Sequence, residues 1–106
     1  MEKINFASLA ESIKKPWSPI EIVRMNGYHL LLSRFEGAYR FHKHDAEELF
    51  FVLKGSVTIE SKDKTIILKE GEGLVLPKGS VHRSIAQEPS LVIMFERTNL
   101  KTVFVP

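Results

Sequence analysis

The sequence predicts an all-β protein, a sandwich or barrel of about ten short strands with one short helix near its start. Apolar and β-branched residues occur in short runs along most of the chain, and turn-forming residues separate these runs at close intervals. The length of 106 residues suits one hydrophobic core, and 43% hydrophobic with 26% charged residues is an ordinary globular composition. A chain of this composition is expected to fold rather than to remain disordered.

The helix is predicted within the first sixteen residues. Four apolar residues there recur at helical spacing: Phe6, Leu9, Ala10 and Ile13. Ser8 and Glu11 have the spacing of a capping box. Pro16 and Pro19 end the helix, because proline lacks the N–H group that a helix interior needs. Trp17 lies between the two prolines, and we expect it to pack the end of the helix onto the sheet.

The strands are predicted from residue 20 onward, each bounded by turn-type residues such as the Asn-Gly, Lys-Gly and Pro-Lys-Gly segments. The predicted ranges are 20–25, 28–35, 39–44, 48–53, 56–61, 65–69, 74–76, 82–86, 91–96 and 102–105. The last break but one falls at the turn-type dipeptide Glu88-Pro89.

Charge and composition narrow the classes of function. Lys and Arg total 15 and Asp and Glu total 13, so the net charge of +2 gives no reason to expect a nucleic-acid partner. The longest apolar runs are far shorter than the ~20 residues that a membrane span needs, and no secretory signal is recognisable. We therefore expect a cytoplasmic protein. The chain has no cysteine, which leaves His, Asp and Glu as the strong metal ligands.

The strand at 48–53 bears on assembly, because both of its alternating faces are apolar. Phe50 and Val52 share one face, and Leu49, Phe51 and Leu53 share the other, so neither face should meet water. The helix, the strand at 102–105 or a second subunit could cover the outer face. We predict a homodimer.

Three of the four histidines and one glutamate form a candidate metal site. His42 and His44 are two residues apart on a predicted strand, so their imidazoles leave the same face and can converge on one ion. Glu48 opens the next strand and His82 comes from a distant one. Each residue also has a plain structural interpretation: unrelated histidines, a solvated charge at a strand end, or a hydrogen-bonded core histidine. His29 has no partner at ligand spacing and is expected on a strand surface or an interface.

The spacing of these residues resembles the two sequence motifs of the cupin family. His42-Lys43-His44, three residues, Glu48, six residues and Gly55 resemble the first motif. Gly71, five residues, Pro77-Lys78-Gly79, two residues and His82 resemble the second. Together the two motifs cover roughly residues 37 to 86. The chain is therefore similar to a small single-domain cupin.

The resemblance implies a double-stranded β-helix, a jelly-roll β-barrel, with a short N-terminal helix. One domain would span residues 1–106, with the helix and arm at 1–19 and the barrel at 20–106. The resemblance also implies one divalent metal ion held by His42, His44, Glu48 and His82. Three imidazoles and a carboxylate leave coordination positions open and suit Fe(II), Mn(II), Ni(II), Zn(II) or Cu(II).

The alternation of side chains along strands predicts what lines the cavity around this site. Arg40 shares a face with His42 and His44, Phe50 and Val52 with Glu48, and Ser84 with His82. We expect these residues to contact a small-molecule ligand, with Arg40 as an anchor for an anion. The alternative for Arg40 is a salt bridge at the solvent end of its strand.

Three functions are compatible with this site. The favoured one is a divalent-metal-dependent enzyme of small-molecule metabolism, of dioxygenase or isomerase type, with Glu48 as a candidate proton shuttle. The second is a non-catalytic cupin that binds or senses a metabolite. The third is a structural module stabilised by its metal. A sugar-phosphate isomerase is a weaker inference, because Arg40 alone would have to hold the phosphate.

Overall fold

The computed structural model describes residues 1–106 and contains one helix and nine strands. The helix is α1 (Phe6–Ser12). The strands are β1 (Ile20–Met25), β2 (Tyr28–Ala38), β3 (His42–His44), β4 (Glu48–Lys54), β5 (Ser56–Ser61), β6 (Thr65–Lys69), β7 (Gly73–Leu76), β8 (His82–Arg97) and β9 (Thr102–Phe104). The prediction of an all-β protein with a short N-terminal helix is confirmed.

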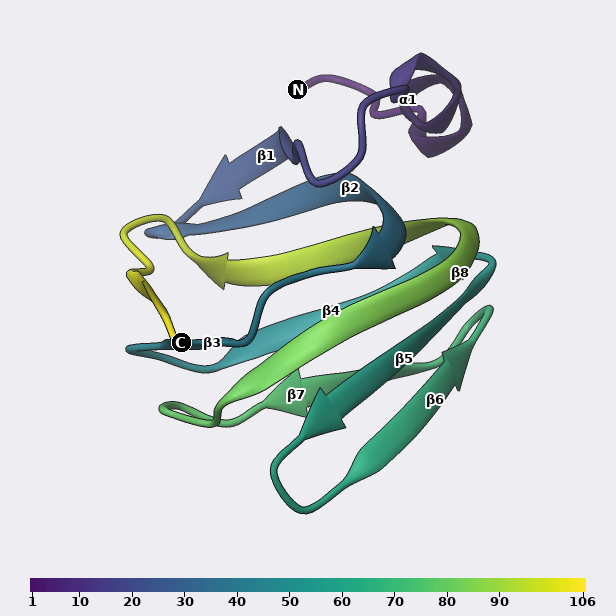
Figure 1. The fold of residues 1–106 in the computed structure, drawn as a ribbon. Coiled ribbons are helices and arrows are strands. Elements are labelled where there is room, and N and C mark those ends of the chain that lie inside the picture. Colours follow the sequence, from purple (N-terminus) through teal and green to yellow (C-terminus); the bar gives the residue numbers. More distant parts are fainter.

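All strand pairs are antiparallel, and the sheet curls into a barrel of jelly-roll type around β8 (Figure 1). The C-terminal half of β8 pairs with β2 and β4, and these strands lead on to β1 and β7. The N-terminal half of β8 pairs with β3 and β5, which lead on to β9 and β6. One long strand therefore belongs to both walls of the barrel.

The continuity of β8 corrects the prediction of two strands separated at Glu88-Pro89. The register against β2 moves from Phe35 opposite Ser90 to Gly37 opposite Ala86, so residues 87–89 have no partners in β2. Pro89 lies in this unpaired stretch, where no ladder hydrogen bond is needed and the strand bends from one wall to the other.

The helix also differs from the prediction in its cap. Asn5, rather than Ser8, is the N-cap, and its side-chain oxygen accepts a hydrogen bond from the backbone N–H of Ser8 at 3.1 Å. The helix ends at Ser12, and Ile13, its C-cap, is buried. No helix in the structure has the length and apolar character needed to cross a membrane.

The core lies between the two walls of the barrel and consists of side chains from their inner faces. The buried cluster contains Phe35, Phe50, Val52, Val57, Ile59, Leu68, Leu76, Ala86, Val92 and Met94. Val52 is wholly buried in this cluster. Phe35, Phe50 and Met94 of this cluster also border the cavity described below.

The outer face of β4 is only partly covered. Leu49 and Phe51 remain 38% and 36% exposed. The helix lies near Leu53 at the far end of the strand, and β9 pairs with β3 instead of covering β4. Neither terminus therefore covers the apolar outer face. Of the three candidates named from the sequence, the second subunit of the predicted homodimer remains.

Candidate metal centre

Three histidines from two strands meet at the end of the barrel. His42 lies opposite His82 in the register of β3 and β8, and His44 follows on the same face of β3. One ring nitrogen from each residue lies within 4.8 Å of the other two. The ring centroids of His42 and His82 are 4.4 Å apart. The predicted convergence of these three imidazoles is therefore seen in the structure.

Each of the three rings is held through its Nδ1 atom. His42 Nδ1 lies 2.7 Å from the carbonyl oxygen of Arg40, and His82 Nδ1 lies 2.9 Å from that of Ser80. His44 Nδ1 lies 2.9 Å from the hydroxyl oxygen of Thr102 on β9. A carbonyl oxygen can only accept, so Nδ1 of His42 and of His82 carries the proton and Nε2 offers its lone pair.

The remaining polar atoms of the site fit a cation. The Nε2 atoms of His44 and His82 and Oε1 of Glu48 are buried without a hydrogen-bond partner. Burial lowers the pKa of all three imidazoles, that of His82 to about 4, so they are neutral at pH 7. Unpartnered buried acceptors are costly, and neutral imidazoles are the form that binds metals. The donor set therefore suits a divalent metal ion.

Glu48 stands at the edge of this cluster. It begins β4, is buried, and places Oε1 3.1 Å from Nε2 of His44, in a geometry that is not aligned for a hydrogen bond. Burial raises the pKa of the Glu48 carboxyl group. The compact cluster itself comprises the three histidines, and Glu48 adjoins it beside His44.

A cavity of about 210 Å³ opens beside the cluster, and four aromatic side chains line it: Trp17, Phe35, Tyr39 and Phe50. The indole of Trp17 packs on Phe35 at 4.6 Å and on Tyr39 at 4.8 Å between ring centroids. The lining residues are Trp17, Pro19, Leu31, Ser33, Phe35, Tyr39, His42, His44, Glu48, Phe50, Ser84, Met94, Glu96, Leu100 and Thr102. None of them is Lys or Arg.

Residues 35–96 match the sequence model of the cupin domain. The chain belongs to the cupin family. It is 34% identical to the protein YdbB of Bacillus subtilis (strain 168), over 95% of this chain and 91% of that protein. The crystal structure of a cupin-2 domain containing protein from Shewanella frigidimarina superposes with a TM-score of 0.87 at 36% identity, covering 89% of this chain and 93% of that one.

A third similarity is confined to part of a longer enzyme. A segment that makes up 57% of this cupin is 36% identical to a segment of the 3-hydroxyanthranilate 3,4-dioxygenase of Nematostella vectensis. That segment makes up 24% of the dioxygenase. The matched segment covers about a quarter of that enzyme.

The cupin places its four expected ligand-contact residues in three different settings. Phe50 and Ser84 line the cavity. Val52 is buried in the core and does not reach the cavity. Arg40 is exposed outside the cavity, with its guanidinium 4.2 Å from the centre of the Phe104 ring.

Several residues of the site were not found from the sequence. Trp17 was expected only to pack the end of the helix onto the sheet, but it also forms a wall of the cavity and donates from Nε1 to the carbonyl oxygen of Glu36. Glu96 lines the cavity, as Glu48 does, and follows Phe95, which pairs with Leu49. A signal for Glu96 was present, because it continues the inward alternation of Val92 and Met94.

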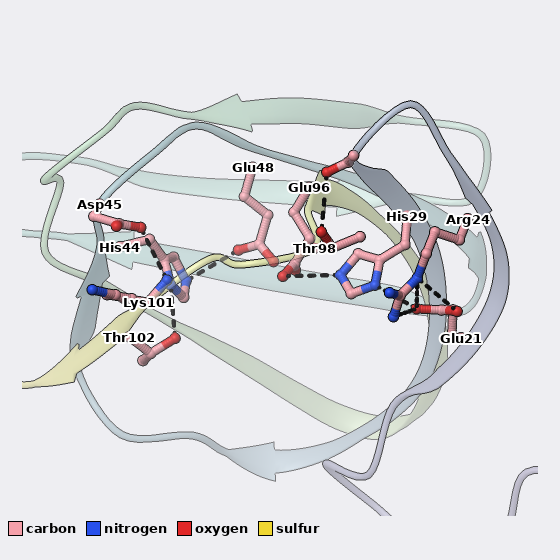
Figure 2. A network of polar contacts seen from close by, with 11 residues as sticks. Glu21, Arg24, His29, His44, Asp45, Glu48, Glu96, Thr98, Lys101 and Thr102 are labelled. Carbon is pink, nitrogen blue, oxygen red and sulfur yellow. Dashed lines mark hydrogen bonds and ion pairs between the residues drawn. The ribbon is translucent and has the colours of Figure 1, made fainter.

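His29 is also part of this region rather than of a surface. Its side chain is 13% exposed and lies between the carboxyl groups of Glu21 and Glu96 (Figure 2). No spacing in the sequence indicated this position, because it depends on the register that sets His29 opposite Glu96.

Proposed function

We propose that this cupin is a divalent-metal-dependent enzyme of dioxygenase type acting on a small neutral aromatic compound. The observation that carries the proposal is the convergence of three buried, neutral imidazoles on one side of an aromatic cavity. His42, His44 and His82, with Glu48 beside them, would hold the metal. When bound there, the metal would supply Lewis-acid polarisation or, as Fe(II), a site for dioxygen chemistry.

The cavity itself supports a neutral substrate. Apart from the proposed metal, the cavity has no cationic group to hold a phosphate or carboxylate, because no Lys or Arg lines it. The absence of a basic lining weighs against a sugar-phosphate isomerase. A volume of about 210 Å³ is below the ~300–1,000 Å³ of drug-sized pockets and suits a single ring.

The chain's own residues have distinct roles in this proposal. Trp17, Phe35 and Phe50 would hold a ring against the metal side of the cavity and exclude water. Ser84 would orient a substrate hydroxyl group. Glu48 would accept a proton from that hydroxyl, because its carboxyl group faces the cavity and its raised pKa brings it nearer to neutral pH.

The first test is the metal content of the purified protein. We expect near-stoichiometric divalent metal in the wild type by elemental analysis and its loss in the His42→Ala/His82→Ala variant. Lys43→Ala is the matched control, since Lys43 is exposed on the same strand between the two ligands. A wild-type protein that holds no metal and takes up none would refute the proposed site.

The second test addresses the reaction. Protein loaded with Fe(II) without air would be mixed with hydroquinone or catechol and dioxygen, and oxygen uptake measured beside substrate loss. Dioxygenation consumes one O₂ per ring and releases no hydrogen peroxide, because both oxygen atoms enter the product. Tight binding of these phenols without turnover would favour a ligand-binding or sensing cupin, and isomerisation of a sugar phosphate would contradict the neutral-substrate proposal.

We also propose that the protein is a homodimer joined through the outer apolar patch. This patch consists of Tyr28, Leu49, Phe51, Val75 and Phe95. The residues are adjacent, because Leu49 is opposite both Val75 and Phe95 and the Tyr28 ring stacks on Phe95 at 5.4 Å.

The border of the patch supports a second copy of the chain as its occupant. Lys78 and Arg97 carry positive charge and Asp45 and Glu47 carry negative charge within one surface pocket beside the patch. A border with both signs can pair with itself across a two-fold axis.

A further inference from the structure

Two lining residues of the cavity come from the arm that joins α1 to β1. They are Trp17 and Pro19, whereas the other lining residues belong to the strands of the barrel or to the segments between them. The arm passes beside β2 (Figure 1), and Trp17 ties it there with two hydrogen bonds. Its backbone N–H donates to the carbonyl oxygen of Arg34 at 2.8 Å, and Nε1 donates to that of Glu36 at 3.0 Å. The indole is therefore fixed against β2 at both its backbone and its ring.

The backbone of Trp17 lies in the left-handed region, with φ of 56°. This conformation is unfavourable for a residue with a Cβ atom, and glycine adopts it more readily. Strained residues persist only where their surroundings hold them, and they concentrate at functional sites. Here the two hydrogen bonds to β2 and the bridge between Pro16 and Arg34 hold the strained residue. The arm therefore keeps a bulky indole in the cavity wall at a position that favours glycine.

Tyr39 links the indole to the metal side of the cavity. The indole packs on Phe35 and Tyr39, and the Tyr39 ring lies edge-on to His42 with 5.4 Å between centroids. The Nδ1 contacts of the three histidines all go to residues other than Trp17. A change at Trp17 thus alters the space in the cavity without removing a proposed metal ligand or its support.

The volume of the cavity shows what the indole excludes. A cavity of about 150 Å³ is enough to hold benzene, so about 210 Å³ leaves room for one substituted ring and little for a second. We propose that Trp17 determines the size of the substrate, because its indole closes the space that a second fused ring would occupy. This inference rests on the proposed function, since it takes the cavity as the site for a neutral aromatic compound.

Two probes of different size test this role by binding alone. Catechol carries two neighbouring hydroxyl groups on one ring, and its analogue with a second fused benzene ring carries the same pair. Calorimetry on the purified protein with its metal, without air, would measure both affinities before any reaction with dioxygen. Elemental analysis and circular dichroism would check the metal content and the fold of each variant.

The variants separate the size of the indole from its support of the arm. Trp17→Ala removes the indole, and Trp17→Leu keeps an apolar side chain of smaller size if Trp17→Ala does not fold. Ile13→Ala is the matched control, since Ile13 is buried on the same arm and does not line the cavity. It loosens the packing of the arm and leaves the wall of the cavity unchanged.

We expect the wild type to bind catechol at least about tenfold more tightly than the two-ring analogue. Trp17→Ala should bind the analogue about 10–100-fold more tightly than the wild type does, because the second ring is buried in the vacated space. Its affinity for catechol should fall about 2–10-fold with the loss of an aromatic neighbour. Trp17→Leu should change both affinities in the same directions by less, and Ile13→Ala should keep the wild-type ratio.

A purely structural indole would lower the stability of the variants and leave the ratio of the two affinities unchanged. That result in a folded Trp17→Ala or Trp17→Leu protein would overturn the inference while the proposed function stands. A wild type that binds both probes equally, or the same reversal in Ile13→Ala, would also overturn it. A wild type that holds its metal but binds neither probe would refute the proposed aromatic substrate, and this inference with it.

Discussion

At the scale of single residues, the tautomer of each buried histidine decides whether it can bind a metal. His42 and His82 both contact the carbonyl oxygen of the residue two positions earlier, so the backbone alone holds these rings. His44 differs, because its Nδ1 atom depends on the Thr102 side chain from β9. A substitution of Thr102, which lies outside the two cupin motifs, should therefore free the His44 ring to rotate without altering the other two imidazoles.

Thr102→Val is expected to weaken metal binding about tenfold while leaving the fold intact, because it removes the only side-chain partner of His44 Nδ1. Metal affinity would be measured by chelator competition. Thr98→Val is the control, since the Thr98 hydroxyl donates to the carbonyl oxygen of Gly27 and to no histidine. Equal losses in the two variants would count against a specific role for Thr102.

The stabilising contribution of Glu21, through its contacts with Arg24 and His29, depends on pH. The hydrogen bond from Arg24, then that from His29, lowers the pKa of Glu21 below its ordinary value of 4.5. A carboxylate with a lowered pKa stabilises the fold above its unfolded pKa, and this stabilisation is lost as the pH falls through the folded value.

We therefore expect Glu21→Gln to lower the free energy of unfolding at pH 7. The difference in this free energy between the variant and the wild type should shrink as the pH falls below 4.5. Urea unfolding of the metal-free proteins at several pH values would measure this. Glu2→Gln, at an exposed carboxylate without an ion pair, should match the wild type throughout. A difference for Glu21→Gln that does not change with pH would contradict the prediction.

At the scale of elements, the bend in β8 depends on a close approach by the turn between β4 and β5. Gly55 has φ of +93°, and a Cβ atom there would lie 2.8 Å from Cβ of Ser90. Ser90 accepts a hydrogen bond from the backbone N–H of Ser56 at 3.1 Å, so the turn and the bend are tied together. The glycine of the first motif thus serves packing between elements as well as the turn.

Gly55→Ala is expected to lower the free energy of unfolding by about 2–4 kcal/mol, from the left-handed backbone and the collision with Ser90 together. Gly71→Ala separates the two effects, because Gly71 also has a positive φ, +82°, with open space around it. It should cost about 1–2 kcal/mol. Urea unfolding measures both values, and equal losses would show that the contact with Ser90 does not matter.

The elements also show how far the sequence could predict the structure. Period-two patterns and turn residues defined most strands, and motif spacing indicated the histidines that the structure brings together. The join of two predicted strands into β8 was missed, because whether Pro89 ends a strand depends on what lies opposite it. The contact of His29 with Glu96 was missed for a similar reason, since it follows from the register of β2 and β8.

At the scale of the whole molecule, the outer face of β4 is an apolar surface that one chain leaves partly exposed. Its apolar residues come from strands that also form the wall of the cavity, because Glu48 and Phe50 face inward in alternation with Leu49 and Phe51. An interface on this face would therefore support the metal side of the barrel from outside.

The expected mass in solution at micromolar concentration is twice the 12.1 kDa of the chain. Phe51→Glu should yield monomers, because it places a charge in the outer apolar patch. Ile67→Glu is the control, since Ile67 is 61% exposed on β6, outside the patch. Light scattering after size-exclusion chromatography would measure the masses. A monomeric wild type, or a Phe51→Glu protein that remains dimeric, would contradict this assignment.

The position of β8 in both walls has a kinetic consequence. Neither wall can close until the last quarter of the chain pairs with β2, β3, β4 and β5, so most contacts join residues far apart in sequence. Such a topology folds slowly compared with helical proteins of equal length. His82 arrives with β8, and the metal centre can assemble only when this late strand docks. Metal capture during refolding would therefore report on the docking of β8 in the barrel.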